Sequence, residues 1–252
     1  MMPSLGSHLT SAYGLASRLG DVRIDADRGA YYLGSTAPDM RVLMGVDRRL
    51  THFFDLADFE QQDSIARMFE EYPQLLDAAS LDAATCAFLA GYMTHLLMDE
   101  HYIQSIYREF FGERSALGGD LWANVLDRAL QYEMNRRELA DDAALAEVRT
   151  AIDASQATVG VDFIDAALWP EWRDFTRGIT HQQADWERFP RVIHAHLRRA
   201  GFSDEDIEAA ASNPPQIVQE AVEHVSEERL GRYLEEATEL AFERLREYLP
   251  AG

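Results

Sequence analysis

One long apolar stretch, residues 84–111, limits most strongly what this chain can fold into. It contains no proline, and His95 and Asp99 stand near its centre. A helix buried in a protein core accepts an imidazole and a carboxylate only where partners or a metal ion satisfy them. At about 100° per residue, the two side chains project within about 40° of each other. We therefore expect the function of the protein to lie beside this pair.

The rest of the sequence favours helices. Alternating Val/Ile/Thr runs and Asn-Gly turns, which are typical of strands and hairpins, are missing, so we predict an all-α fold. Prolines are few and no Ser/Gly-rich linker divides the 252 residues, so we expect a single multi-helical domain over residues 1–252.

Apolar periodicity, with Gly and Pro as terminators, predicts the helix positions. The expected ranges are about 8–19, 27–33, 59–72, 80–112, 120–139, 143–154, 170–186, 190–200 and 216–248, with a brief acidic helix from Ser203. The last range is rich in Glu and Arg pairs at helical spacing. We expect it to be a solvated outer helix and a candidate contact for a homo-oligomer.

The charge of the chain excludes one class of partner. There are 44 acidic residues against 23 basic ones, a net charge of −21, so the surface repels phosphate backbones and stable nucleic-acid binding is not expected. A phosphate ester could still bind in a pocket where metal ions reverse the local sign. The single cysteine, Cys86, excludes an intrachain disulfide framework and a cysteine-rich metal site.

The sequence shows no targeting signal. The first ten residues lack a basic segment followed by an apolar run, and no apolar segment reaches membrane-spanning length without a charge. We therefore expect a cytoplasmic protein with no transmembrane segment.

Five residues in the first hundred have the chemistry of a metal site: His8, Asp39, His52, His95 and Asp99. Metal sites assembled from helices and ordered loops commonly combine neutral imidazoles with carboxylates in this way. Pro38 fixes the backbone just before Asp39 and so holds the approach of that carboxylate.

Four segments that contain these residues resemble the bacterial zinc-dependent phospholipase C family. The segments are His8, YLGSTAPD at 32–39, Thr51-His52 and GYMTHLLMD at 91–99, and they occur in the order of the family's pattern. The resemblance covers roughly the first 110 residues. It implies the all-helical fold that this family shares with the zinc-dependent single-strand nucleases.

The resemblance also implies a site and a reaction. Asp39, His52 and His95 would hold one divalent ion, His8 would hold a second, and Asp99 would bridge them. A pair of ions about 3.5–4 Å apart would let a bridging hydroxide attack a phosphoric ester, with Asp39 as a candidate proton acceptor. Zinc is the expected metal, and iron, nickel and manganese suit the same ligands.

The substrate implied is a phospholipid head group or a small phosphodiester. Two tyrosines flank the active face and are candidate substrate contacts: Tyr92 and Tyr102.

The chain departs from the family pattern in two places. Secreted members use a processed N-terminal Trp as a ligand, whereas Met1 or Met2 stands ahead of His8 here. The pattern for a third metal is also incomplete. The candidates for a third site or for supporting contacts are His101, Glu133 or Glu138, His181, Asp185 and, beside His52, Asp55.

Other interpretations remain open at this point. His95 and Asp99 could be a hydrogen-bonded pair within a bundle, and Asp39 could cap a turn. The HD-type phosphohydrolases, which are also helical and dinuclear, need an adjacent His-Asp dipeptide that this chain lacks. A non-catalytic structural or interaction protein that retains a metal site is the main alternative.

Overall fold

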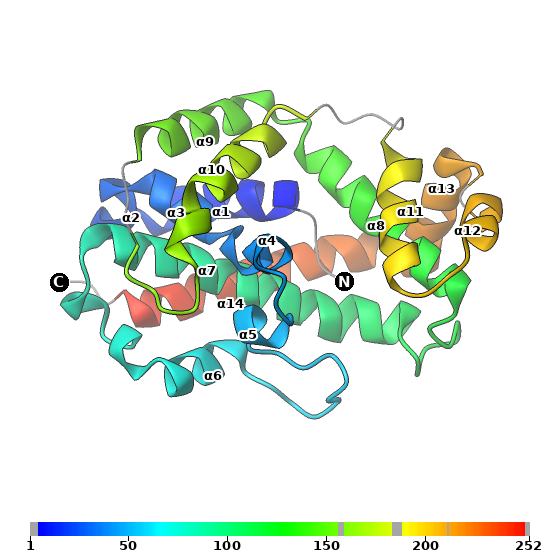
Figure 1. Ribbon diagram of the computed structural model, residues 1–252, viewed down its shortest axis with the longest axis horizontal. Coiled ribbons are helices and arrows are strands. Elements are labelled where there is room, and N and C mark those ends of the chain that lie inside the picture. Colours follow the sequence, from blue (N-terminus) through cyan, green and yellow to red (C-terminus); the bar gives the residue numbers. More distant parts are fainter. Residues whose placement is uncertain (1–4, 156–158, 183–187, 211, 250–252) are drawn as a thin grey trace.

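The computed structural model describes residues 5–155, 159–182, 188–210 and 212–249, and within them it contains helices and connections but no strand (Figure 1). The all-α prediction is confirmed. The α-helices are α1 Leu5–Leu19, α2 Val22–Ala26, α3 Arg28–Gly34, α4 Arg41–Met44, α5 Arg49–His52, α6 Ser64–Glu71, α7 Ala83–Tyr102, α8 Leu121–Glu138, α9 Asp142–Ala154, α10 Trp169–Ile179, α11 Phe189–Arg199, α12 Asp204–Ala210, α13 Pro214–Val225 and α14 Glu227–Tyr248. Short 3₁₀ turns are η1 Ala37–Met40, η2 Pro73–Leu75, η3 Ala78–Ser80 and η5 Ala166–Leu168, and η4 Ile103–Phe111 is π-helical.

The central apolar stretch forms α7, as expected, and its continuation η4. The side chain of Asp82 caps α7 by accepting the backbone N–H of Thr85 at 3.0 Å. After Tyr102 the chain changes to π-helical geometry, and Gly112 ends it. The predicted helix 80–112 is thus correct in extent but not in regularity.

Two apolar clusters make up the core, and α7 belongs to both. One cluster contains Phe88 and Tyr92 of α7 together with residues of α1, α3, α6, α9 and α10. The other contains Met98 and Tyr102 with residues of η4, α8, α11, α13 and α14. In Figure 1, α11, α12 and α13 gather beside α8 at one end of the molecule. The polar residues of α7 therefore lie where the two clusters meet.

Two glycines let α3 approach α7 closely. A Cβ at Gly34 would overlap the carbonyl oxygen of Phe88, and a Cβ at Gly91 would overlap that of Tyr31. Because both obstacles are backbone atoms, no rotamer change could relieve the overlap. The sequence at these two positions thus sets the distance between α3 and the polar face of α7.

The helix predicted at 216–248 is divided. Ser226, with φ of 76°, separates α13 from α14, and its side chain caps α14 by accepting the backbone N–H of Arg229 at 3.2 Å. One face of α14 is buried in the molecule, where Tyr233 donates its hydroxyl to the carbonyl of Met98. The prediction of one continuous helix is therefore wrong, and the outer helix α14 has one face buried rather than being solvated all round.

Two other boundaries differ from the predictions. The helix expected from residue 59 begins at Ser64, where Asp63 caps it. The helix expected over 170–186 ends at Ile179, and residues 183–187 lie outside the described part of the chain.

No helix among the described residues has both the length and the apolar character needed to cross a membrane.

The glycine contact gives a stability prediction. Gly91→Ala should lower the free energy of unfolding by about 3 kcal/mol, the upper end of the usual range for overpacking, because α3 and α7 must separate. Gly14→Ala is the matched control, since nothing lies within 4 Å of a Cβ at that exposed helical position. It should stabilise the protein by about 0.5–1 kcal/mol. Urea denaturation measures both, and equal effects would contradict the close contact.

Candidate metal centre

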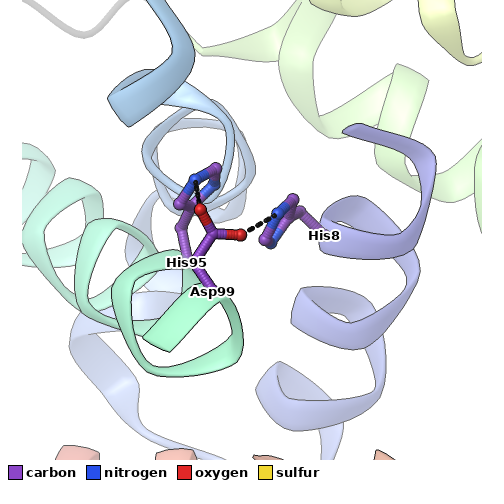
Figure 2. Close-up of side chains that lie close together, drawn as sticks. All are labelled: His8, His95 and Asp99. Atoms are coloured by element: carbon purple, nitrogen blue, oxygen red, sulfur yellow. Dashed lines mark ion pairs between the residues drawn. The ribbon is translucent and has the colours of Figure 1, made fainter. Parts of the chain in front are cut away.

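Four separate elements bring the five predicted ligands together. His8 comes from α1, Asp39 from η1, His52 from the end of α5, and His95 and Asp99 from α7. Figure 2 shows His8 reaching across from α1 toward Asp99, with His95 on the same helix as the carboxylate. The three imidazoles and Asp99 are almost fully buried, and Asp39 is 8% exposed. The predicted convergence of these residues is observed.

The distances between the ligand atoms suit a metal ion better than hydrogen bonds. The Nε2 atoms of His8, His52 and His95 lie 3.3, 3.4 and 3.6 Å from the nearest Asp99 oxygen. Hydrogen bonds to oxygen are 2.7–3.2 Å long. Two ligands each about 2.1 Å from a tetrahedral ion lie about 3.4 Å apart. The donor atoms are thus spaced like ligands around an ion.

In His95 and His52, hydrogen bonds to neighbouring residues determine which ring nitrogen is left free to bind a metal ion. His95 Nδ1 lies 2.8 Å from the carbonyl oxygen of Ser35, which can only accept, so Nδ1 carries the proton. His52 Nδ1 lies 3.0 Å from the hydroxyl of Thr51, which itself donates to the carbonyl of Arg48. Both rings therefore direct an Nε2 lone pair into the centre, as a metal ligand requires.

The centre contains buried polar atoms that have no hydrogen-bond partner. They are the Nε2 atoms of His8, His52 and His95, His8 Nδ1, and one oxygen each of Asp39 and Asp99. A buried polar atom without a partner costs about 1–3 kcal/mol, so a cluster of them on one point needs a ligand to account for it. The residues present therefore fit a divalent cation.

The described residues form two ligand groups that share one histidine. His8, His95 and Asp99 make one group, and Asp39, His52 and His95 make the other. His95 has only Nε2 free, so it can serve one ion at a time. Asp99 can add its second oxygen to the second group, which then offers four protein ligands, whereas His8 and Asp99 alone remain for another ion.

The loop that carries Asp39 is held by residues far along the sequence. The indole of Trp172 in α10 donates to Thr36 Oγ1 at 3.1 Å, and Thr176 contacts the same hydroxyl at 3.3 Å. Thr36 is next to Ser35, whose carbonyl orients His95. The side chains of α10 thus position both Asp39 and the histidine on α7.

Two arginines that sequence reasoning missed lie at the centre. Arg48 donates from Nη2 to Asp99 Oδ2 at 2.8 Å, and its side chain is 10% exposed. Arg41 Nε lies 4.0 Å from Asp39 Oδ1. Spacing could have revealed Arg48, which stands four residues before His52 and so shares its helical face.

Burial and charge together set the protonation of the centre. Burial lowers the pKa of His8 and, with help from the Arg48 charge, holds the pKa of His52 well below its ordinary value. Burial also opposes charge on His95, but the Asp99 carboxylate outweighs it and raises the pKa of His95. Burial acts against ionisation of Asp99, yet His95, His52 and His8 hold its pKa well below the usual range.

The residues proposed for a third metal do not join the centre. His101 pairs with Glu236 at 3.1 Å and stacks on Tyr233 of α14, while Glu133 is bound by Arg136 and Arg137. Glu138 accepts from Thr10 at 2.7 Å. His181 is exposed after α10, and Asp185 lies outside the described residues. The four of these side chains that the structure describes therefore give no support to a third site.

The remaining candidates act as structural contacts. Asp55 accepts the backbone N–H of Ala57 and lies 3.6 Å from Arg49. Tyr92 is fully buried and donates to the carbonyl of Thr51, beside His52, and Tyr102 is fully buried and donates to Asp127 at 2.9 Å. Neither hydroxyl is open to a substrate, so Tyr92 supports the centre through α5 and Tyr102 belongs to the second core cluster.

The lowered pKa values of His8 and His52 predict a pH dependence for metal-free protein. Below about pH 6.5 these two imidazoles bind protons in the unfolded chain but stay neutral in the folded protein. The free energy of unfolding therefore falls as pH falls, by up to about 1.4 kcal/mol per pH unit for each group. The raised pKa of His95 acts in the opposite sense: its contribution is complete below pH 6.5 and is lost as pH rises through the folded value.

Urea denaturation of chelator-treated protein between pH 6.5 and 5 measures this slope. His52→Asn removes one of the two groups, so the free energy of unfolding should depend less steeply on pH, by up to about 1.4 kcal/mol per pH unit. His181→Asn, which replaces an exposed histidine outside the centre, is the matched control and should leave the slope unchanged. An unaltered slope in the His52 variant would contradict the buried, neutral state of that ring.

Comparisons with known proteins leave the family unassigned. No family model matches the chain, and neither a curated protein nor a solved structure matches it.

Proposed function

We propose that this protein is a metal-dependent hydrolase of phosphoric esters. The observation that carries the proposal is the set of unpartnered imidazole nitrogens and carboxylate oxygens converging from α1, η1, α5 and α7. The resemblance of these segments to the zinc-dependent phospholipase C family supplies the reaction class. A phospholipid head group and a small phosphodiester are the two candidate substrates.

The protein's own residues have distinct tasks in this proposal. Asp39, His52, His95 and Asp99 would hold a divalent ion, with zinc as the first choice, and His8 with Asp99 would hold a second ion completed by non-protein ligands. The ions would supply Lewis acidity, which lowers the pKa of water and offsets charge on phosphoryl oxygens. Ser35 and Thr51 keep the two histidines in the tautomer that leaves Nε2 free.

Asp39 is the proposed proton acceptor. Its Oδ1 has no hydrogen-bond partner, and among the five ligand residues its side chain is the most accessible. A carboxylate in this position can take the proton of an attacking water without a protein nucleophile. The ester would therefore approach from the Asp39 side of the centre.

A non-catalytic role is the alternative proposal. In that case the chain would use the ion to join its two core clusters, and the charged outer surface of α14 would contact a partner or a second copy. Both proposals expect bound metal, and only the first expects turnover.

Metal analysis combined with an ester assay tests the proposal. Purified protein should contain one to two divalent ions per chain and cleave a chromogenic phosphoric bis-ester, and a chelator should abolish turnover. His95→Gln should weaken metal binding more than 100-fold, since even groups that only orient a ligand are worth about 10- to 100-fold. His101→Gln, on the same helix but outside the centre, is the matched control and should keep both metal and turnover. Bound metal without turnover would favour the non-catalytic role.

A further inference from the structure

Arg48 is unusual among the buried residues of the centre. Its guanidinium is nine-tenths buried, but only Nη2 has a partner, the Asp99 carboxylate at 2.8 Å. The other two nitrogens, Nε and Nη1, are buried without any hydrogen-bond partner. Arg41 Nε, 4.0 Å from Asp39 Oδ1, is also buried without a hydrogen-bond partner.

A structural ion pair does not explain this arrangement. Arginine and carboxylate frequently pair through two parallel N–H bonds, whereas Arg48 uses one nitrogen and leaves Nε and Nη1 without a hydrogen-bond partner. Leaving buried guanidinium donors unpaired costs free energy unless something else accepts them. Unpaired acceptors for a cation and unpaired donors for an anion therefore lie side by side in the same centre.

The charges of the centre lead to the same conclusion. Arg41 and Arg48 balance Asp39 and Asp99, and histidines bind a metal ion as neutral imidazoles. A divalent ion would therefore give the centre a surplus of positive charge. An anionic ligand would remove that surplus in a site shielded from water, where it matters most.

Exposure indicates where such an anion would enter. His8 and His95 are fully buried, while the side chain of Asp39 is 11% exposed and that of Arg41 is 27% exposed. The accessible side of the centre is therefore the side that carries the arginines.

We propose that Arg48, assisted by Arg41, forms an anion-binding site for the non-bridging oxygens of a phosphoryl group beside the metal ligands. The planar fork of arginine suits two such oxygens. The inference deepens the hydrolase proposal and rests on it for the identity of the anion. Arg48 would bind substrate directly, while its Nη2 contact holds Asp99 in place.

The competing interpretation treats Arg48 as a counter-ion of Asp99. A metal ion would then displace it, and removing Arg48 would strengthen metal binding without affecting anions. The two interpretations predict opposite results for the same variant.

Calorimetric titration with inorganic phosphate, on metal-loaded protein whose metal content has been measured, tests the inference. Arg48→Gln should retain metal and bind phosphate at least about tenfold more weakly, the loss expected for one hydrogen bond to a charged group. Arg41→Gln should show a smaller loss. Arg49→Gln is the matched control: this neighbouring arginine is 60% exposed and pairs with Asp47, so its loss should change nothing.

Arg48→Lys gives a second test if the Gln variant does not fold. It keeps the charge but not the fork, and phosphate affinity between that of wild type and a tenfold loss supports the inference. Phosphate binding equal to wild type in a folded Arg48 variant would overturn it, whatever the turnover. If wild type binds metal and phosphate through Arg48 but cleaves no ester, the anion site stands and the hydrolase proposal fails.

Discussion

The contact between α3 and α7 is the constraint on which the centre depends. Gly34 and Gly91 let the two backbones touch, and this brings the carbonyl of Ser35 to within 2.8 Å of His95 Nδ1. That bond turns the free nitrogen of His95 toward Asp99 and also fixes where the chain leaves α3 for Asp39. A larger side chain at either glycine would move the ligands on both elements together. Two residues without side chains thus set the geometry of the most polar part of the core.

Much of the fold could be predicted from periodicity and terminators. The extents of α7, α8 and α9 follow from their apolar spacing and from the aspartates that cap them, and that of α11 follows from Pro190 in its first turn and Gly201 after its end. The break at Ser226 could not be predicted in this way, because serine rarely adopts a positive φ and the apolar pattern continues across it. The π-helical geometry of η4 likewise leaves no clear mark in the sequence.

The ligand residues of the centre could be predicted from the sequence, but its two arginines could not. Imidazoles and carboxylates in an apolar context stand out, because each is costly to bury alone. Arginines do not stand out in a chain whose 23 basic residues are all arginine, and about half of these are solvent-exposed. Arg48 becomes distinctive only when the structure shows it buried with two nitrogens unpaired.

Trp172 gives the centre an optical reporter. Its indole is 2% exposed and donates to Thr36, three residues from Asp39 and one from the carbonyl that orients His95. The emission of a buried, hydrogen-bonded indole depends on that bond and on the polarity around it. Changes of the loop at Asp39 would therefore appear in the intrinsic fluorescence of the protein, without any label and without a substrate that is turned over.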